Sequence, residues 1–355
     1  MQVDIKKDKN LVTLNNLGQT GLVNLGNTCF INTAIQCFSS IKHFVAYFLS
    51  DQYLQDINKS KESDFVKCFS DILKLMWSEN CIVRPVKFKK KLSEFYEEYS
   101  GTDEDDSSEC FLKIITLLHE GLNYKVNIIS LNSDDPKTYM EKVNKEAFQS
   151  WKNYFENSYS IPVKLFYGQF WERRKCISCG IIKSTFSPFG GMIYLPVKKN
   201  TNTLSDCIKE YTTSEDRIGD NQIYCEKCKK NTDAKSKISV WRLPSVLTLA
   251  FQRFDNHRKL TNYINFSVNK VNFFELTERE KHKNVFYDLV AIANHRGSII
   301  GGHYWAFCRG TNGKWYEYND DSVTEIPDTS SLVTNKAYYL VYVRRDIKSD
   351  IVISS

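Results

Sequence analysis

The spacing of hydrophobic residues divides the chain into a helical first half and a strand-rich second half. Apolar side chains recur at helical spacing from Thr28 to Ile41, and amphipathic helices are also predicted over residues 64–76, 86–99, 108–121 and 139–156. Period-two alternation rich in β-branched and aromatic residues predicts mainly antiparallel strands over 161–175, 190–197, 237–254, 285–296, 303–309, 314–326 and 337–345. Helices followed by strands are typical of an α+β fold, with a cleft between the two parts as the natural place for a site.

Composition and charge narrow the class of protein. The 355 residues are 42% hydrophobic and 25% charged, which excludes a disordered or collagenous chain. A net charge of +6, from 48 basic and 42 acidic residues, gives no strong case for a nucleic-acid partner. No run approaches the roughly 18 apolar residues that span a bilayer, and the first ten residues lack the apolar stretch of a signal peptide. We therefore expect an intracellular protein of the cytoplasm or nucleus, without membrane insertion.

Eleven cysteines raise the question of thiol chemistry. In a reducing compartment such thiols are buried, catalytic or metal-bound. Two Cys-x-x-Cys pairs, Cys176 with Cys179 and Cys225 with Cys228, are separated by 225 − 179 = 46 positions. Four thiolates suit a closed structural zinc site, so we interpret the pairs as Zn²⁺ ligands rather than as disulfides. The cysteines expected to pack in the core are Cys37, Cys68, Cys81, Cys110, Cys207 and Cys308.

Cys29 stands at a predicted loop-to-helix junction in the segment GLVNLGNTCFIN. Unpaired N–H groups at a helix N-terminus favour a thiolate, so we expect the pKa of Cys29 to lie below that of a free thiol. The same N–H groups, together with the side-chain amide of Asn24, can donate to an oxyanion. The alternative is a capped helix that merely begins with cysteine, and spacing alone favours that alternative.

A predicted strand that contains a histidine, later in the chain, favours the interpretation of Cys29 as a nucleophile. His303 follows two glycines in GGHYWAF, and alternation puts His303, Trp305 and Phe307 on one sheet face. Downstream, the segment KWYEYNDDSV offers Asn319 and Asp320 as acceptors that can hold the imidazole tautomer. A cysteine protease needs a base for the thiol proton and an acid for the leaving amine, and histidine serves both steps. The alternative is a histidine that packs at a strand end before a plain turn.

Taken together, these segments resemble the ubiquitin-specific protease family of cysteine deubiquitinases. The family's cysteine box is similar to the segment GLVNLGNTCFIN, and its histidine box is similar to the stretch from YDLVAIANHRG to GGHYWAF. Three further segments resemble family segments and follow in the same order along the chain: DDSSECFLKIITLLHE, LFYGQFWERRKCISCG and AYYLVYVRR. The resemblance covers residues 21 to about 345 and implies a papain-like cysteine protease core. It implies an extension at 1–20, a thumb at about 21–160, a palm at about 161–175 and 240–345, zinc-bearing fingers at about 176–239, and a tail at 346–355.

The resemblance also assigns roles to the candidate active-site residues. Cys29 is implied as the nucleophile, His303 as the general base and acid, and Asn319 as the residue that orients the histidine. Asn24 stands where the family has an oxyanion-stabilising asparagine, and Asp320 is expected to assist polarisation. The family uses either Asp or Asn at the position of Asn319, so activity is expected to survive the neutral acceptor.

The predicted substrate contacts lie in an acidic segment and around the histidine box. Residues 97–109 contain seven carboxylates and no Lys or Arg, so they either attract the arginine-bearing tail of ubiquitin or form a solvated helix entry. Within it, Asp105 replaces a glutamine that the family often places against the tail, and Asp106 follows.

The other substrate contacts come from the resemblance around the histidine box. Gly301 and Gly302 are implied to frame the glycine pair of the substrate tail. His295 is placed in the loop before the catalytic histidine, as loop structure or substrate gating.

The implied reaction is hydrolysis of the isopeptide or peptide bond after the C-terminal glycine of ubiquitin. The expected partners are ubiquitin and ubiquitinated proteins, and the chain is expected to act as a monomer. One alternative is a non-catalytic ubiquitin-binding scaffold, against which the presence of nucleophile, base and orienting residue argues. A second is an isopeptidase for another ubiquitin-like modifier, which nothing in the sequence excludes.

Overall fold

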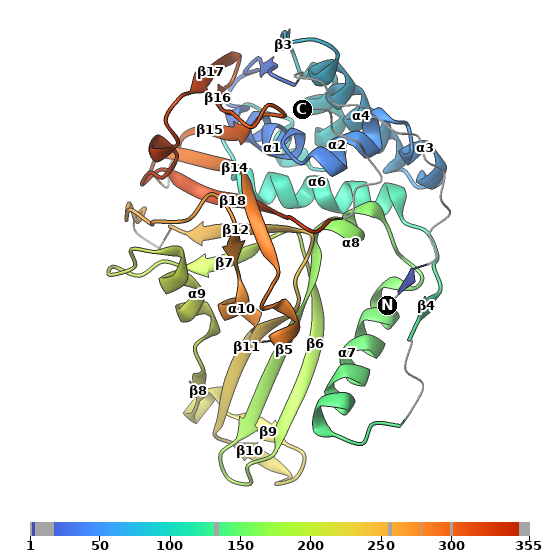
Figure 1. Cartoon of the computed structure of the whole chain (residues 1–355), viewed down its shortest axis with the longest axis vertical. Helices are drawn as coiled ribbons and strands as arrows, with labels where there is room; N and C mark the ends of the chain where they lie inside the picture. Colours follow the sequence, from blue (N-terminus) through green and yellow to red (C-terminus); the bar gives the residue numbers. More distant parts are fainter. Residues whose placement is uncertain are drawn as a thin grey trace.

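The chain, as a computed structural model, forms a helical layer at one end, a central sheet beneath it, and a long narrow sheet that extends away from the helices (Figure 1). The structure describes residues 2–3, 18–130, 135–254, 258–277, 279–298 and 301–347, so most of the expected N-terminal extension and C-terminal tail lies outside the described residues. The helices are α1 (Cys29–Ser39), α2 (Lys42–Leu49), α3 (Tyr53–Asp56), α4 (Ser63–Ser78), α5 (Val86–Ser93), α6 (Ser107–Leu122), α7 (Tyr139–Phe155), α8 (Ile161–Phe166), α9 (Leu204–Thr212) and α10 (Phe274–Thr277). Short 3₁₀ turns are η1 (Glu97–Tyr99), η2 (Gly219–Asn221), η3 (Glu280–His282) and η4 (Thr329–Leu332).

The central sheet has eight strands, and its neighbours are antiparallel except for the β12–β7 pair. Its order is β17 (Ser322–Ile326), β16 (Trp315–Asn319), β15 (Gly302–Arg309), β14 (Phe286–Gly297), β18 (Ala337–Arg344), β12 (Val246–Gln252) and β7 (Ile193–Pro196), with β13 (Val271–Asn272) paired to β14. The predicted, mainly antiparallel sheet is therefore confirmed.

The long sheet has four strands, in the order β6 (Ile182–Gly190), β5 (Tyr167–Cys176), β11 (Ala234–Arg242) and β8 (Glu215–Arg217). At its far end lies the hairpin of β9 (Ile223–Cys225) and β10 (Lys230–Thr232) (Figure 1). Two small pairs complete the described strands: β1 (Gln2–Val3) with β4 (Ile128–Ile129), and β2 (Gly21–Leu22) with β3 (Ile82–Val83).

The helices predicted over 64–76, 108–121 and 139–156 are confirmed as α4, α6 and α7, and the one over 86–99 is divided into α5 and η1.

The strand predicted over 161–175 is wrong in its first part, which is helix α8. The Ser160 side chain accepts from the N–H of Val163, and Pro162 fits the first turn, where its missing N–H costs nothing. The second part, β5, belongs to the long sheet rather than to the central sheet.

The segment expected to form the fingers, about 176–239, does not lie in the long sheet alone. Strand β7 and helix α9 fall within residues 176–239, yet β7 pairs with β12 in the central sheet and α9 packs beside it. The strand predicted over 237–254 is divided at residues 243–245 into β11 and β12, which lie in different sheets. A strand that leaves one sheet and enters another keeps the same hydrophobic pattern, so the pattern alone does not show the break.

Helix α1 is buried on every side, because it lies between β15 and the other helices. All of its residues are buried, whereas the periodicity predicted a single buried face. Phe38 stacks on Phe111 of α6 with ring centroids 4.1 Å apart and meets Phe69 of α4 edge-on at 5.7 Å. The last turn of α1 is thus packed against α6 and α4. No helix among the described residues is both long and apolar enough to cross a bilayer.

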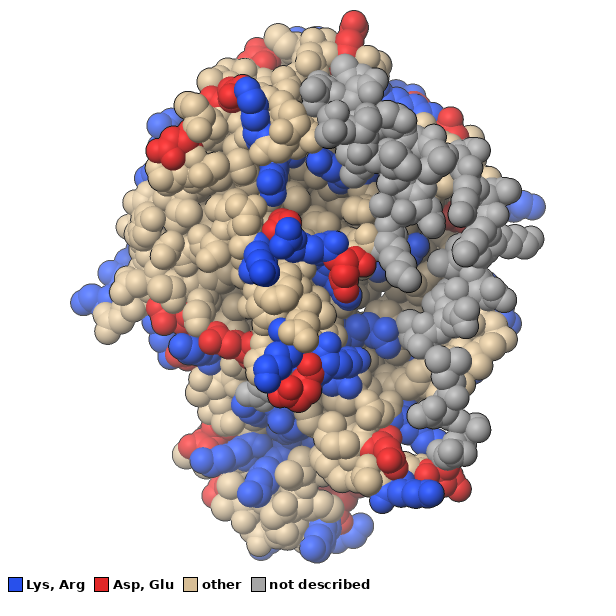
Figure 2. Space-filling view, in the orientation of Figure 1, with Lys and Arg blue, Asp and Glu red and all other residues tan. Residues whose placement is uncertain are grey.

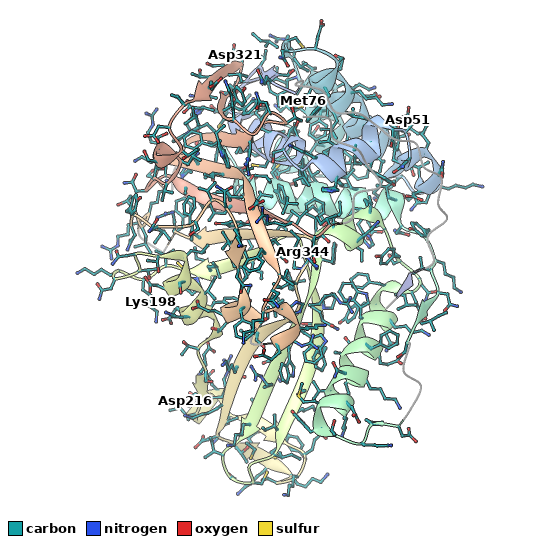
Figure 3. The ribbon with its side chains drawn as sticks, in the orientation of Figure 1. Asp51, Met76, Lys198, Asp216, Asp321 and Arg344 are labelled. Carbon is teal, nitrogen blue, oxygen red and sulfur yellow. The ribbon has the colours of Figure 1, made fainter. Side chains whose placement is uncertain are left out.

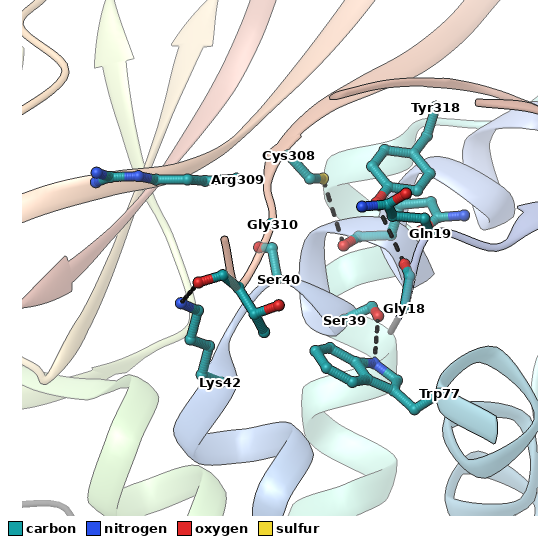
Figure 4. Close-up of a pocket in the computed structure, with 12 residues that line it drawn as sticks. Gly18, Gln19, Ser39, Ser40, Lys42, Trp77, Cys308, Arg309, Gly310 and Tyr318 are labelled. Carbon is teal, nitrogen blue, oxygen red and sulfur yellow. Dashed lines mark hydrogen bonds between the residues drawn. The ribbon is translucent and has the colours of Figure 1, made fainter. Parts of the chain in front are cut away.

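A small cavity marks the seam between α1 and the end of β15 (Figure 4). It is bordered by Trp77, whose indole N–H donates to the Ser39 hydroxyl at 2.9 Å, and by Tyr318, whose hydroxyl donates to the Gly18 carbonyl at 3.2 Å. Its volume is about 20 Å³, room for roughly one water molecule. This cavity is part of the packing between helices and sheet and does not reach Cys29.

Candidate active site

Cys29 is the first residue of α1 and is 3% exposed. The turn before it is closed by Asn24, whose side-chain oxygen accepts from the backbone N–H of Gly26 and of Thr28, both at 3.0 Å. The Thr28 hydroxyl in turn accepts from the N–H of Leu25 at 2.9 Å. This local network fixes the direction in which the chain enters the helix, and with it the position of the thiol.

His303 and Asn319 are brought together by neighbouring strands. His303 lies near the start of β15, and Asn319 ends β16. The imidazole Nε2 is 2.7 Å from the side-chain oxygen of Asn319. An amide oxygen only accepts, so Nε2 is the donor in this contact, and in the neutral tautomer Nδ1 is the nitrogen with the lone pair. The ring of His303 lies nearly parallel to Trp305, with centroids 6.2 Å apart, which agrees with the predicted common face.

Asp320 connects the strand side of the site to the helix side. One carboxylate oxygen accepts from the side-chain N–H of Asn24 at 3.0 Å, and the other accepts from that of Asn32 at 2.8 Å. Its backbone carbonyl accepts from the N–H of Leu22 at 2.8 Å. The carboxylate therefore holds the turn after β16 against α1, while the preceding Asn319 takes the histidine.

The expected acidity of Cys29 is wrong in sign. Burial raises the pKa of its thiol above the usual value, and the negative charges of Asp320 and Glu104 raise the pKa further. The backbone N–H groups of Tyr304 and Phe30 offset only part of this rise. The helix start is too dehydrated for its N–H groups to prevail, so Cys29 needs a base to become a nucleophile. Tyr304, which lies close enough to influence the thiol, directly follows His303 in β15.

Glu104 is a site residue to which the sequence assigned no individual role. Its carboxylate accepts a hydrogen bond from the backbone N–H of Gly302, 198 positions away. A residue from the helical layer thus contacts the segment that leads into His303, and the same carboxylate lies near Cys29.

The neighbouring acidic residues mainly shape the start of α6. Asp106 is the N-cap, since its side chain accepts from the N–H of Ser108 at 2.6 Å, and it also accepts from the hydroxyl of Tyr338. Asp105 accepts from the backbone N–H of Asp106 at 2.6 Å. For Asp106 the structure agrees with the helix-entry alternative. Lys113 pairs with Glu98 at 2.6 Å, so part of the acidic segment is already neutralised.

His295 lies on strand β14, opposite Tyr304, and not in a loop as expected. It is 3% exposed, its ring packs on Tyr304 with centroids 4.4 Å apart, and the Lys259 ammonium lies 2.7 Å from its Nδ1. Burial, followed by the charge of Lys259, lowers the pKa of His295 to about 4. A Cβ at Gly302 would lie 2.3 Å from Nε2 of His295. This close approach is a reason within the chain itself for a glycine at position 302.

The four cysteines of the Cys-x-x-Cys pairs meet at the tip of the long sheet. Their sulfur atoms all lie within 4.8 Å of one another, with 4.0 Å between those of Cys176 and Cys228 and 3.6 Å between those of Cys179 and Cys225. A tetrahedral ion with metal–sulfur bonds of about 2.3 Å requires sulfur–sulfur edges of about 3.8 Å. The cluster therefore fits a metal ion.

All eleven cysteines are free thiols, so no disulfide competes with a metal at the cluster. Cys207 lies buried in the core on α9, as expected, rather than beside the four-cysteine cluster. Cys81 is half-buried and only in part fulfils its predicted place in the core. The other predicted core cysteines are buried, namely Cys37, Cys68, Cys110 and Cys308.

The sequence did not identify Glu104, Asn32 or Lys259 as individual members of the site. Asn32 follows Cys29 by one helical turn, a spacing that alone could have suggested a common location. Lys259 and Glu104 carry no such signal, because their partners are 36 and 198 positions away in sequence.

Comparison with solved structures defines the fold as that of a ubiquitin-specific protease catalytic domain. A chain of the SAGA DUB module Ubp8/Sgf11/Sus1/Sgf73 bound to monoubiquitin matches with a TM-score of 0.74 and 22% identity, covering 96% of this chain and 72% of that one. The module bound to ubiquitin aldehyde matches with a TM-score of 0.72 and 22% identity, covering 95% of this chain and 72% of that one. The predicted α+β fold is thereby confirmed.

Residues 20–342 match the family described as ubiquitin carboxyl-terminal hydrolase, and the chain belongs to that family. Ubiquitin carboxyl-terminal hydrolase 2 of Homo sapiens is 32% identical over 354 residues, covering 95% of this chain and 56% of that protein. Ubiquitin carboxyl-terminal hydrolase 21 of Rattus norvegicus is 29% identical over 333 residues, covering 86% of this chain and 58% of that protein. The chain thus spans little more than half the length of these curated relatives.

Proposed function

We propose that this chain is a thiol-dependent deubiquitinase, which hydrolyses the isopeptide or peptide bond after the C-terminal glycine of ubiquitin. The observation that carries the proposal is the 2.7 Å contact between His303 Nε2 and Asn319, on strands packed against the helix that begins with Cys29. Relatives named as ubiquitin carboxyl-terminal hydrolases support ubiquitin as the modifier.

In the proposed reaction the proton of the Cys29 thiol moves to Nδ1 of His303, the nitrogen that Asn319 leaves free. The thiolate attacks the carbonyl carbon of the terminal glycine, and the resulting oxyanion collapses to a thioester as the amine leaves with the proton from His303. His303 then takes a proton from water, and the hydroxide so formed attacks the thioester. Ubiquitin leaves with a free carboxylate, and the proton returns to Cys29.

Asn24 is proposed to stabilise the oxyanion with the N–H groups at the start of α1. One hydrogen of its side-chain amide is directed to Asp320, and the second remains available for the substrate. Asp320 would thus act by positioning Asn24 and the start of the helix. Glu104 accepts from Gly302 and lies near Cys29, and we propose that the ubiquitin tail displaces it from Gly302 on the way to the sulfur.

The helical layer, the central sheet and the long sheet are proposed to act as thumb, palm and fingers around the body of ubiquitin. The four-cysteine cluster would hold a structural Zn²⁺, with all four positions taken by thiolates and none left for an activating water. Cys29 and these thiolates remain reduced in an intracellular compartment, which is the proposed location. Ubiquitin and ubiquitinated proteins are the proposed partners of a monomeric enzyme.

The deciding experiment uses ubiquitin that carries a thiol-reactive group at its C-terminus. We expect covalent labelling of the wild-type chain, none of Cys29→Ala, and full labelling of Cys81→Ser, which alters a half-buried thiol outside the site. If wild type binds ubiquitin but is never labelled, the chain is a scaffold and the proposal fails. If it is labelled only by the equivalent probe of another ubiquitin-like modifier, the chemistry stands and the substrate is wrong.

A further inference from the structure

Lys259 is a basic residue that the proposed reaction does not use. On the face shown in Figure 2, Lys and Arg side chains project at the surface, many of them beside Asp or Glu. Lys259 is half-buried, and its ammonium contacts one residue at two points: it lies 2.7 Å from Nδ1 of His295 and donates to the backbone carbonyl of His295 at 2.7 Å. The ring and the backbone of His295 are therefore held by the same cation.

The contact with Lys259 decides which ring nitrogen of His295 carries the proton. An ammonium group only donates, so Nδ1 is the acceptor and the neutral ring carries its proton on Nε2. Burial, followed by the charge of Lys259, lowers the pKa of His295 to about 4, so the ring is neutral at pH 7. Burial, followed by Arg253 and Lys336, lowers the pKa of Lys259 to about 8, so most of the ammonium keeps its proton at that pH. His295 is thus a neutral N–H donor with one fixed tautomer.

The Nε2 side of His295 faces the segment that leads into His303. A Cβ at Gly302 would lie 2.3 Å from Nε2 of His295, so this nitrogen lies against the backbone of Gly302. Among the described residues, no group forms a hydrogen bond with Nε2, whereas Nδ1 is taken by Lys259. The ring of Tyr304 packs on the imidazole with centroids 4.4 Å apart. A donor of fixed direction thus lies beside the residue that precedes the proposed base.

Lys259 is itself anchored to the central sheet through Arg253. The side chain of Arg253 is completely buried and donates to the carbonyls of Leu260 at 3.1 Å and Asn262 at 2.9 Å. It also donates to the carbonyl of Ala337, in β18, at 2.7 Å. The segment that carries Lys259 is therefore tied to the same sheet on which His295 lies, which fixes the position of the ammonium.

We infer that Lys259 is a positioning residue that acts through His295, whose Nε2–H donates to a backbone carbonyl of the extended tail of the substrate. The inference rests on the proposed function, in which the tail displaces Glu104 from Gly302 on its way to the sulfur. A neutral donor matches a neutral carbonyl and adds no charge beside His303, whose imidazole takes up a proton in the proposed reaction. Every peptide unit offers such a carbonyl, so this contact recognises an extended main chain rather than a particular side chain.

The test measures KM and kcat for a ubiquitin–fluorophore substrate at pH 7 in Lys259→Met, His295→Phe and the double variant. Methionine keeps the apolar stem of the side chain but has no ammonium. We expect Lys259→Met to raise KM about five- to tenfold, as for the loss of one hydrogen bond. It should change kcat less than about twofold, because the bond is made equally to the bound substrate and to the transition state. Because Lys259 acts through His295, the double variant should have the KM of His295→Phe alone.

The matched control is Lys336→Met. Lys336 is also half-buried and lies near enough to Lys259 to lower its pKa, but its side chain forms no hydrogen bond with a described residue. Its backbone carbonyl, which accepts from the N–H of His295 at 2.9 Å, is kept in the variant. We expect KM and kcat within about twofold of wild type, since a partly exposed charge is largely screened.

Nitrogen NMR of the imidazole rings reports the tautomer of His295 in the absence of substrate, and His295→Phe identifies its signals. We expect the proton on Nε2 in wild type and in Lys336→Met, and a mixture of both tautomers in Lys259→Met. A merely structural role of Lys259 would leave the tautomer unchanged. Lys259→Leu repeats both measurements, so that a folding defect of Lys259→Met cannot decide the outcome, and unfolding midpoints identify such a defect.

Four results would each overturn the inference. They are a proton on Nδ1 of His295 in wild type, a KM of Lys259→Met within twofold of wild type, single-variant effects on KM that multiply in the double variant, and a KM of Lys336→Met raised as much as that of Lys259→Met. Failure of the proposed function is distinguishable, because it requires a wild type that hydrolyses no ubiquitin substrate. Normal turnover with an unchanged KM in Lys259→Met refutes this inference alone.

Discussion

Asp320→Ala is the substitution for which the structure gives the clearest expected magnitude. It removes the acceptor of two hydrogen bonds, from Asn24 at 3.0 Å and from Asn32 at 2.8 Å. Bonds to a charged group contribute about 1.5–3 kcal/mol each. Asn32, 2% exposed, still donates to the Leu22 carbonyl at 3.1 Å but is left with one buried N–H that has lost its acceptor. Asp320 also has a φ of 53°, where alanine is disfavoured by about 1–2 kcal/mol. Because Asp320 itself is only half-buried, we expect a loss of about 3–5 kcal/mol in the free energy of unfolding.

The matched control is Asp321→Ala, at the neighbouring position of the same turn (Figure 3). Asp321 is exposed, and its side chain forms no hydrogen bond with a described residue, so we expect a change within about 0.5 kcal/mol. Asp320→Asn keeps one oxygen as an acceptor but turns an N–H toward one of the two donors, Asn24 or Asn32. We therefore expect about half of the loss in the free energy of unfolding. Urea unfolding followed by tryptophan fluorescence measures all three variants. A difference between Asp320→Ala and Asp321→Ala below about 1 kcal/mol would refute the reasoning.

Three further predictions concern the thiol, the histidine and the cysteine cluster. Burial and two carboxylates raise the pKa of Cys29, so iodoacetamide should alkylate it more slowly than a free cysteine at pH 8. Glu104→Gln removes one of these carboxylates and should speed alkylation. Faster alkylation of the wild type than of free cysteine would contradict this prediction. Asn319→Ala should lower kcat for a ubiquitin–fluorophore substrate by about 100-fold or more, with little change in ubiquitin binding. Asn319→Asp should restore most of the rate. Equal rates for Asn319→Ala and wild type would rule out the proposed orienting role of Asn319. Cys225→Ser should lower both the amount of bound zinc and the unfolding midpoint. The control, Cys207→Ser, should leave the zinc content unchanged. Full zinc content in Cys225→Ser would exclude the proposed ligand set.

Periodicity located the long amphipathic helices well, and it also located α1, although that helix is buried on every side. Helices α4, α6 and α7 have a polar face and were predicted within a few residues of their observed ends. Helix α2, KHFVAYFL, was not predicted, because its aromatic residues are as typical of a strand as of a helix. The strand prediction over 161–175 ignored the start signal of Ser160 and Pro162, which was available in the sequence.

For the candidate site, the sequence suggested several of the residues but not Glu104, Asn32 or Lys259, and it did not show which residues contact one another. The cysteine pairs were recognisable because ligand spacing within a turn is a local property. The contact of Asp320 with Asn32 spans 288 positions, and that of Glu104 with Gly302 spans 198. No local pattern encodes such contacts. The acidity of Cys29 was predicted from its helix start alone, and the error arose because dehydration depends on what packs around the helix.

The distance along the chain between Cys29 and His303 has a consequence for newly made protein. A ribosome adds about 5–20 residues per second. Over 303 − 29 = 274 positions, the sulfur is therefore made roughly 15–55 seconds before the imidazole that is proposed to activate it. During that interval α1 lacks the strand β15 that covers it, and Asn24 and Asn32 lack Asp320. In the proposed mechanism the nascent thiol is therefore without its base until residue 303 has been added.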